Sequence, residues 1–345
     1  MDFAKLDLQI EEYCKKHQIS GMLRITVKDA ILFEKNMGYA DAEAKTPFTK
    51  DAMFTLYSLS KPFCALGLLR LVEAGRVLLA AHPSVYVPEA KGFDPAVTVR
   101  HLLNHTSGLP DFELNKEFAA RYPHGYAHEV RGQLEALSVM PQVFAPGTKM
   151  LYANINFILS ALIIEAVTGE SYQTYMTREV FEPLGMKSAV VDNETKEIAH
   201  RVTGYALQDG VPIPAAKSHD WMLGAGDVVA TVDDVYCLNT AAKCNLLVSK
   251  EMWEEILSRS DVGYFGYGCS VFDWHGKRMI RHNGGHEGFR TLHVWIPECD
   301  FDIIFLSNSG YGNARDDLTE MIHTAFFGKG GAYERHEMDA GYIKN

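Results

Sequence analysis

Apolar positions recur with two different periods along this chain, and the change of period divides it into three parts. Near the N-terminus, Phe3, Leu6 and Ile10 recur at helical spacing and predict a helix over residues 2–17. Two short apolar or alternating runs follow at 22–27 and 31–38, and a polar turn separates them. This arrangement predicts an antiparallel hairpin.

The middle of the chain has a helical pattern. Apolar residues keep helical spacing over residues 60–74, 97–103, 155–167 and 172–180. Residues 109–146 have no regular pattern, and irregular stretches of that length in compact proteins usually carry function. We therefore expect this stretch, together with the region of Trp221, to form the walls of a substrate groove.

The last third returns to strand patterns, which predict strands at 267–272, 278–282, 289–296 and 301–307 and a final helix at 314–327. Strands at both ends and helices between them predict an α/β fold, with an antiparallel sheet flanked by helices and built from both termini. The expected division is a sheet domain (1–56 and 197–330), an inserted mainly helical domain (57–196) and a C-terminal tail (331–345).

Composition limits the classes of partner. The 345 residues carry a formal net charge of −11 and no lysine- or arginine-rich run, so we expect no nucleic-acid partner. No run of 18 apolar residues is present, which predicts no membrane span. The charged N-terminus does not look like a secretory signal, and the six cysteines form no CxxC pair. We expect a cytoplasmic protein with reduced thiols, unless a leader was removed; the oligomeric state stays open.

Ser58 and Lys61 form an S-x-x-K pair where an apolar helical pattern begins. Positions three apart share a helix face, so the serine hydroxyl and the lysine amine can meet. A serine becomes an effective nucleophile when a neighbouring base takes its proton, and a lysine in a dry pocket can have a pKa low enough to do so. A helix N-terminus also offers free N–H groups to an oxyanion. The pattern alone equally fits an N-capping serine followed by a surface lysine.

A second pair, Tyr152-x-Asn154, directly precedes the apolar run at 155–167. A tyrosine beside Lys61 can move a proton between Ser58 and a leaving group. An asparagine there can hold a substrate amide oxygen and bind the lysine. These residues predict Ser58, Lys61 and Tyr152 as the catalytic set, with Asn154 contacting the substrate.

A third segment, His282-Asn283-Gly284-Gly285, stands at the end of a predicted strand. Glycines at a strand edge let a substrate lie against the backbone, so we expect the first three residues to contact it. The N–H of Gly285 would join that of Ser58 as an oxyanion hole. The alternative is a glycine-rich turn with a surface histidine.

The ordered set resembles the serine β-lactamase and penicillin-binding-protein superfamily, and its Tyr-x-Asn is similar to the class C branch with its carboxypeptidases, D-aminopeptidases and esterases. The segment HLLNHTSGLP at 101–110 also resembles that family, as do Gly224-Ala225-Gly226 and Thr231-x-x-Asp234. The resemblance covers roughly residues 22–328 and rests on three motifs in order: Ser58-x-x-Lys61, Tyr152-x-Asn154 and His282-x-Gly284.

The resemblance implies a serine hydrolase that works through an acyl-enzyme on a small molecule or short peptide: an ester, an amide or a D-amino-acid peptide. Ser58 would attack the carbonyl, with either Lys61 or Tyr152 as the base. One position departs from many β-lactamases, which have lysine where this chain has His282. A histidine is mostly neutral near pH 7, so we expect weak β-lactam hydrolysis. Arg290 either supplies the missing charge or is a structural arginine.

Three other hypotheses compete with this one. A zinc site would use a histidine pair spaced by four, but no H-E-x-x-H is present, and we expect no metal. Gly224-Ala225-Gly226 begins like a dinucleotide loop but lacks the third glycine, and we expect no cofactor. The third is a catalytically silent penicillin-binding or ligand-sensing module of the same fold, which would be acylated without turnover. The histidine pairs are His101 with His105, His124 with His128, and His282 with His286.

Overall fold

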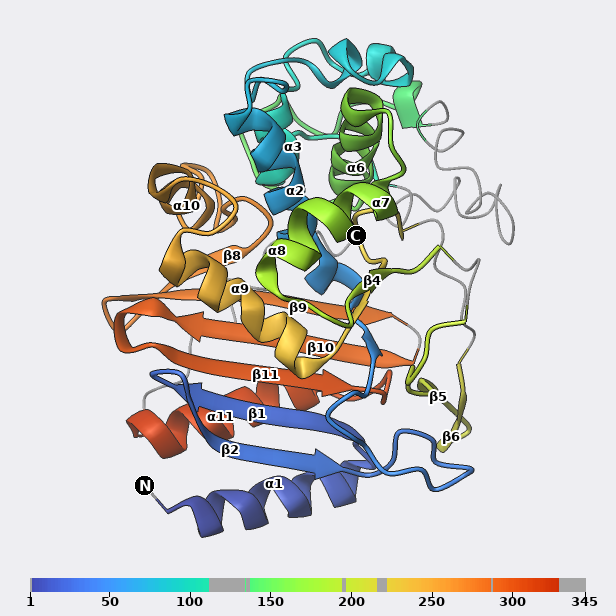
Figure 1. Cartoon of the computed structure of the whole chain (residues 1–345), viewed down its shortest axis with the longest axis vertical. Helices are drawn as coiled ribbons and strands as arrows, with labels where there is room; N and C mark the ends of the chain where they lie inside the picture. The colour runs from blue at the N-terminus through green and yellow to red at the C-terminus, as the bar shows by residue number, and fades with distance from the viewer. Residues whose placement is uncertain are drawn as a thin grey trace.

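An antiparallel sheet of six strands, in the order β2-β1-β11-β10-β9-β8, runs through the middle of the molecule (Figure 1). The computed structural model describes residues 2–111, 134, 137–193, 197–215, 222–286 and 288–328. The strands are β1 (Gly21–Val27), β2 (Ala30–Met37), β8 (Ser270–Trp274), β9 (Lys277–His286), β10 (Phe289–Ile296) and β11 (Phe301–Ser307).

The sheet is assembled from both ends of the chain. β1 pairs with β11 along its whole length, from Gly21 opposite Ser307 to Val27 opposite Phe301. The N-terminal hairpin of β1 and β2 thereby extends the four C-terminal strands. The predicted α/β fold, with a flanked antiparallel sheet formed by both termini, is confirmed.

Side chains of alternate residues enter two separate cores, one on each face of the sheet. On one face, α1 (Phe3–His17) and α11 (Ala314–Phe327) pack side by side. Leu6 and Ile10 of α1 are fully buried there, as the helical spacing predicted. The burial of each large apolar side chain in this way stabilises the folded protein by about 1.5–3 kcal/mol.

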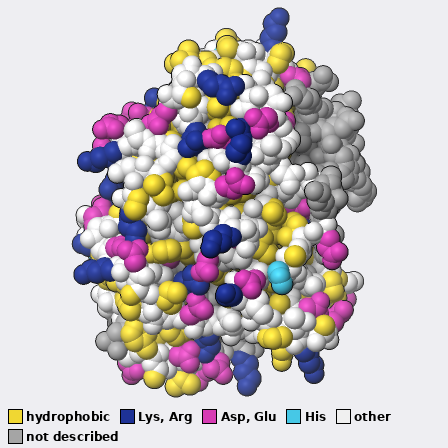
Figure 2. All heavy atoms as spheres, viewed as in Figure 1, with side chains coloured by type: hydrophobic (Ala, Val, Ile, Leu, Met, Phe, Trp, Pro, Cys, Tyr) yellow, Lys and Arg dark blue, Asp and Glu magenta, His cyan; other side chains and the backbone are white. Residues whose placement is uncertain are grey.

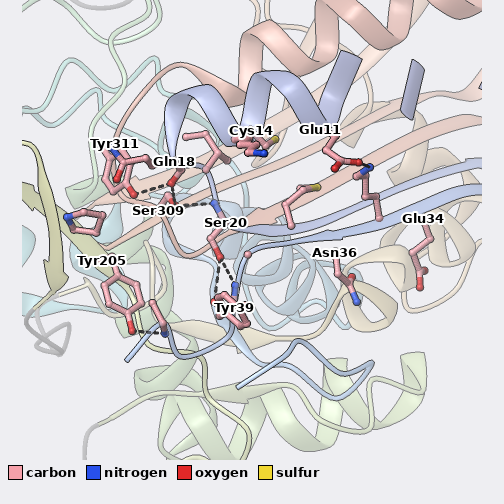
Figure 3. Close-up of a pocket in the computed structure, with 17 residues that line it drawn as sticks. Glu11, Cys14, Gln18, Ser20, Glu34, Asn36, Tyr39, Tyr205, Ser309 and Tyr311 are labelled. Carbon is pink, nitrogen blue, oxygen red and sulfur yellow. Dashed lines mark hydrogen bonds and ion pairs between the residues drawn. The ribbon is translucent and has the colours of Figure 1, made fainter. Parts of the chain in front are cut away.

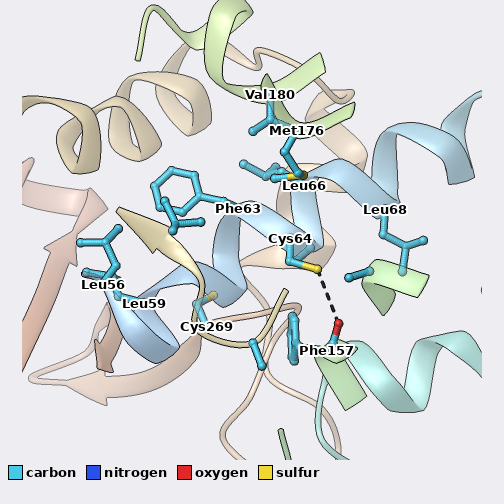
Figure 4. Close-up of a cluster of buried hydrophobic side chains, with 14 of the residues drawn as sticks. Leu56, Leu59, Phe63, Cys64, Leu66, Leu68, Phe157, Met176, Val180 and Cys269 are labelled. Carbon is cyan, nitrogen blue, oxygen red and sulfur yellow. Dashed lines mark hydrogen bonds between the residues drawn. The ribbon is translucent and has the colours of Figure 1, made fainter. Parts of the chain in front are cut away.

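The other face carries the helical region that holds the candidate site. Its long helices are α2 (Lys61–Glu73) and α6 (Ile155–Thr168), which pack against each other. Phe63 and Leu66 of α2 lie in one apolar cluster with Phe157 of α6 (Figure 4). Every residue of α6 from Ile155 to Ile164 is buried, which explains why this helix is apolar on all sides.

Shorter elements complete the fold. The helices are α3 (Val99–Leu103), α7 (Tyr172–Met176), α8 (Glu182–Leu184), α9 (Val232–Cys244) and α10 (Lys250–Ile256). Single helical turns lie at η1 (Tyr57–Ser60), η2 (Pro83–Val85), η3 (Pro88–Gly92), η6 (Thr177–Phe181) and η8 (Pro297–Cys299). Two small sheets pair β3 (Phe54–Thr55), β7 (Val228–Ala230) and β4 (Val190–Val191), and β5 (Tyr205–Gln208) with β6 (Val211–Pro214).

Several boundaries differ from the sequence prediction. The strand expected at 267–272 is β8, shifted to Ser270–Trp274, and the strand expected to end at 282 is β9, which continues to His286. The helix expected at 172–180 extends through a π-helical turn to Leu184. α9 and α10 were not predicted. Their apolar spacing is interrupted by polar residues, so tertiary packing rather than local pattern defines them.

The predicted domain boundaries remain a prediction, and the tail at 331–345 lies outside the described residues. On the face drawn in Figure 2, acidic and basic side chains are interspersed among uncharged ones. Taken alone, none of the described helices has the length and hydropathy needed to cross a bilayer; α6 passes that test only jointly with the helical segment 172–184, at a bend of 85°. The cytoplasmic location and the exclusion of nucleic acid stay predictions.

Candidate active site

Ser58 lies in the single turn η1, directly before α2, on the side of the sheet that carries the helices. The Leu56 N–H donates to the Val228 carbonyl at 2.8 Å, which ties this turn to β7. Tyr57 has φ of 49°, an uncommon conformation for a residue with a side chain. Ser58 is half-buried, whereas Leu59 is fully buried. The turn therefore leaves the hydroxyl at the edge of the core.

Lys61 is completely buried, and its amine contacts three oxygen atoms. Nζ lies 3.1 Å from the Ser58 hydroxyl, 2.8 Å from Oδ1 of Asn154 and 2.7 Å from the Ala225 carbonyl. It also lies 4.8 Å from the ring centre of Tyr152. The structure thus brings together the first two motifs predicted from the sequence.

The number of hydrogen bonds that Lys61 can form sets its possible role. The Asn154 and Ala225 oxygens only accept, so each takes one N–H from the amine. The remaining position faces Ser58. An ammonium group donates a third N–H there, and a neutral amine offers its lone pair to the serine O–H. The same geometry therefore serves both states of a proton transfer between Nζ and Oγ.

Tyr152 and Asn154 are held where the chain enters α6. The main-chain N–H of Asn154 donates to the carboxylate of Asp111, a buried residue. The Tyr152 ring packs against the imidazole of His105, with ring centres 4.4 Å apart, and against Phe265 at 5.8 Å. Tyr152 is half-buried, so its ring borders both the core and the accessible side of the site.

His282 is buried in β9 and is a neutral group. Its Nδ1 lies 2.8 Å from the Asn283 carbonyl, which only accepts, so Nδ1 carries the proton. Within the described part of the chain, Nε2 is buried without a hydrogen-bond partner. Burial, followed by the charge of Lys61, lowers the pKa of His282 to about 3. The position therefore does not supply a cation near pH 7.

β9 is pressed against the segment that precedes Ser58. A Cβ added at Gly284 would lie 1.9 Å from the Leu56 carbonyl, so only glycine fits there. Among the described strands, β8 pairs with β9 no farther than Arg281. Beyond that residue none of the described strands pairs with this edge of β9, which contacts the η1 turn and could take an extended substrate. The third motif therefore lies inside a strand, a correction to its expected place at a strand end.

The side chains of two predicted residues, Asn283 and Arg290, are directed away from the Ser58 hydroxyl. Asn283 pairs with Leu292 and Gly285 with Arg290 across the β9–β10 ladder, on the face that carries α11. The Arg290 guanidinium donates to the carbonyls of His286 and Phe289, at 2.7 and 2.8 Å. Arg290 thus links the two ends of the β9–β10 hairpin, and its expected contact with substrate stays a prediction. The contributions of Gly285 N–H to an oxyanion hole and of Asn283 to binding stay predictions.

The sequence motifs did not identify the carbonyl of Ala225. The segment Gly224-Ala225-Gly226 forms a turn, in which Gly224 has φ of 68° and Ala225 accepts from Lys61. The Gly224 N–H donates to the buried carboxyl of Asp227 at 2.8 Å, and burial raises the pKa of that carboxyl to about 7. The two glycines were the available signal, since they allow a turn to approach a side chain closely.

Other predicted features lie elsewhere. His101 accepts from the Thr98 N–H at 3.2 Å, and so caps α3 rather than facing His105. In the residues that the structure describes, no three side chains of metal-binding type cluster. Trp221, His124 and His128 are outside the described residues, as is much of the predicted groove wall at 109–146.

A surface pocket of about 730 Å³ lies away from Ser58, between the end of α1, strand β2 and the turn after β11 (Figure 3). Several of its polar groups form local hydrogen bonds. The Tyr311 hydroxyl donates to the Gln18 carbonyl at 2.8 Å, and the Ser20 hydroxyl donates to the Tyr39 carbonyl at 3.0 Å. The lining contains none of the motif residues. The motif residues therefore lie outside this pocket.

Comparison with known proteins identifies the family. A family model described as Beta-lactamase matches residues 6–325, which is most of the chain. The chain belongs to the β-lactamase family. Penicillin-binding protein 4* of Bacillus subtilis (strain 168) is 28% identical over 328 residues, which cover 88% of this chain and 71% of that protein.

Solved structures of the family superpose on most of the chain. A penicillin-binding protein from Bacillus halodurans gives a TM-score of 0.79 at 24% identity, over 92% of this chain and all of that one. A D-amino acid amidase from Ochrobactrum anthropi SV3, complexed with L-phenylalanine amide, gives 0.74 at 25% identity, over 92% and 96%. Family and neighbours indicate a hydrolase of the serine β-lactamase superfamily.

Proposed function

We propose that this protein is a serine hydrolase that cleaves a neutral ester or amide, D-amino-acid derivatives included, through an acyl-enzyme on Ser58. The observation that carries the proposal is the buried Lys61 amine, 3.1 Å from the Ser58 hydroxyl. The amine also donates to the Asn154 Oδ1 and to the Ala225 carbonyl, two acceptors that help to direct it toward the serine. A base held in this way is what a serine hydroxyl needs to become a nucleophile.

The proposed reaction has two steps. Ser58 Oγ attacks the substrate carbonyl while its proton moves to Lys61, and the leaving alcohol or amine departs with a proton delivered through Tyr152. Water then attacks the acyl-enzyme, gives up a proton to the same network and releases the acid, which restores the Ser58 hydroxyl. Lys61 is assigned as the immediate acceptor because its Nζ is within hydrogen-bonding distance of Oγ.

The nature of His282 supports a neutral substrate. The neutral His282 ring in β9 presents Nε2 as an acceptor. It therefore offers no positive charge to a carboxylate such as that of a penicillin or a free peptide C-terminus. A neutral His282 therefore favours esters and amides over β-lactams.

The test is steady-state hydrolysis of a neutral p-nitrophenyl ester by the wild type and the Ser58→Ala, Lys61→Ala and Tyr152→Phe variants. Ser58→Ala and Lys61→Ala should lower kcat by at least about a thousandfold, because serine and base act as a unit. Tyr152→Phe should lower it less, by about 10²-fold, as expected for one general acid.

The matched control is Ser160→Ala. Ser160 is a buried serine whose hydroxyl donates to the Asn156 carbonyl within α6, so its loss removes a hydroxyl and no chemistry. Wild-type turnover in Ser58→Ala would refute the proposal. Acylation of Ser58 by a penicillin without any hydrolysis would instead support the silent penicillin-binding module.

A further inference from the structure

We propose that His105 is a positioning residue that holds Tyr152 in its place. It does so through hydrogen bonds to the main chain on both sides of Tyr152 and through contact with the Tyr152 ring. The inference rests on the proposed function, since it concerns the tyrosine that serves acyl transfer there. His105 is completely buried, and the established family match assigns nothing to it.

Three contacts hold Tyr152 in this way. The Leu151 N–H donates to the His105 carbonyl at 3.0 Å, and the Ala153 N–H donates to the His105 Nδ1 at 3.2 Å. The imidazole ring lies against the Tyr152 ring, with centres 4.4 Å apart and planes inclined by 31°. One residue therefore contacts Tyr152 and both of its chain neighbours.

The backbone of His105 is bent to make this possible. Its φ is 59°, in the left-handed region that costs a residue with a side chain of the order of 1 kcal/mol. Strained backbone of this kind persists where the surroundings hold it, and it concentrates at functional sites. Here the surroundings are the rings of Phe157 and Phe265, whose centres lie 5.3 and 4.7 Å from that of His105.

The contacts also fix the protonation of the ring. A main-chain N–H only donates, so the Nδ1 that faces Ala153 must present its lone pair, and the ring proton is on Nε2. Asn156 faces the same Nδ1 at 3.1 Å with its amide nitrogen, while its amide oxygen accepts from the Ser107 hydroxyl at 2.6 Å. A proton on Nδ1 would face these two donors and break both hydrogen bonds. The contacts that hold Tyr152 therefore require a neutral His105.

The consequence for the reaction is selective. Loosening Tyr152 displaces the group that delivers a proton to the leaving atom, whereas Ser58, Lys61 and the edge of β9 stay in place. Small misplacements of a reacting group cost up to about 10²-fold in rate. Loss of His105 should therefore lower kcat and leave KM almost unchanged.

Two variants separate the hydrogen bond to Ala153 from the ring contact with Tyr152. His105→Phe keeps a ring and removes the acceptor for Ala153; His105→Asn places an amide oxygen near the Nδ1 position, tolerates the left-handed backbone and removes the ring. With a neutral p-nitrophenyl ester we expect kcat to fall by about 10²-fold in His105→Phe, and His105→Asn to recover about tenfold of that loss. KM should change by less than about threefold in both.

The matched control is His323→Phe. His323 is also a fully buried histidine among aromatic rings, Trp274 and Phe301 among them, but it lies in α11 on the far face of the sheet. It should lose thermal stability without loss of kcat. If His105→Phe behaves in the same way, with a lower Tm and wild-type kcat, the inference is overturned. A wild type that is never acylated on Ser58 would mark failure of the proposed function itself.

Discussion

At the scale of single residues, the site is defined by which groups can carry charge. Lys61 is surrounded by oxygen atoms, two of which can only accept hydrogen bonds. His282 is held neutral by burial and by the nearby charge of Lys61, while the Asn283 carbonyl fixes its proton on Nδ1. The motif residues and their order were predictable from the sequence. The protonation of His282 was not, because it depends on burial and on the charge of Lys61, which come together only in the folded chain.

Substituting His282 by lysine should change substrate preference. A lysine ammonium at position 282 would bind a substrate carboxylate through a charge-assisted hydrogen bond. Such a bond contributes about 1.5–3 kcal/mol of binding free energy. We expect His282→Lys to lower KM by about tenfold or more for an ester that carries a free carboxylate, with little change for its neutral methyl-ester counterpart. Equal KM ratios for the two substrates in wild type and variant would contradict the role given to His282.

At the scale of elements, the site depends on close approach between segments that are distant in sequence. β9 reaches the η1 turn only because Gly284 lacks a side chain. α9, which the apolar pattern missed, begins with a capping box in which Thr231 and Asp234 bind each other's main-chain N–H. That signature was visible in the sequence as Thr231-x-x-Asp234 and predicts a helix start. The end of β9 was not visible, since its glycines favour a turn locally.

Adding a methyl group at Gly284 should disrupt the site more than the fold. The Cβ of Gly284→Ala would overlap the Leu56 carbonyl, so β9 must move away from the nucleophile. We expect a fall in kcat/KM of about 10²-fold for a neutral ester.

Thr231→Ala serves as the comparison, because it removes the cap of α9 and should cost about 1 kcal/mol of unfolding free energy. Its kcat/KM should stay at the wild-type value. Equal kcat/KM in the two variants at matched stability would show that the approach of β9 is not required.

At the scale of the whole molecule, the two sheet faces have different tasks. The face covered by α1 and α11 is an apolar core, and the face that carries α2 and α6 holds the buried polar groups of the site. Assembly of the sheet from both termini followed from the distribution of strand patterns. The behaviour of the buried titratable groups did not follow from the sequence. The pKa of Asp227 is raised only when α2, β7 and its own turn come together and bury it.

These buried groups should leave a signature in the pH dependence of stability. Burial raises the pKa of Asp227 to about 7 from an ordinary 3.8. A raised carboxyl pKa contributes stability that is present at low pH and is lost as pH rises from about 4 to about 7, because the unfolded chain ionises first. His105 and His282, whose pKa values are lowered, have the opposite effect as pH falls below about 6.5.

Asp227→Asn isolates the first of these contributions, since the amide oxygen can still accept from Gly224. Relative to the wild type, we expect the variant to gain unfolding free energy between pH 4.5 and 7.5, by up to about 4 kcal/mol. Urea unfolding at several pH values measures the difference. A gap that does not change with pH would mean that Asp227 ionises normally in the folded protein.

The most direct test of the acyl-enzyme on Ser58 is intact-protein mass spectrometry of the wild type and Ser58→Ala, quenched rapidly after mixing with a neutral p-nitrophenyl ester. We expect one acyl group on the wild type, located on Ser58 by peptide mapping, which disappears as the ester is consumed. Ser58→Ala should carry none. An equal adduct on Ser58→Ala, or hydrolysis by the wild type with no acyl group at any quench time and no loss in Ser58→Ala, would contradict it.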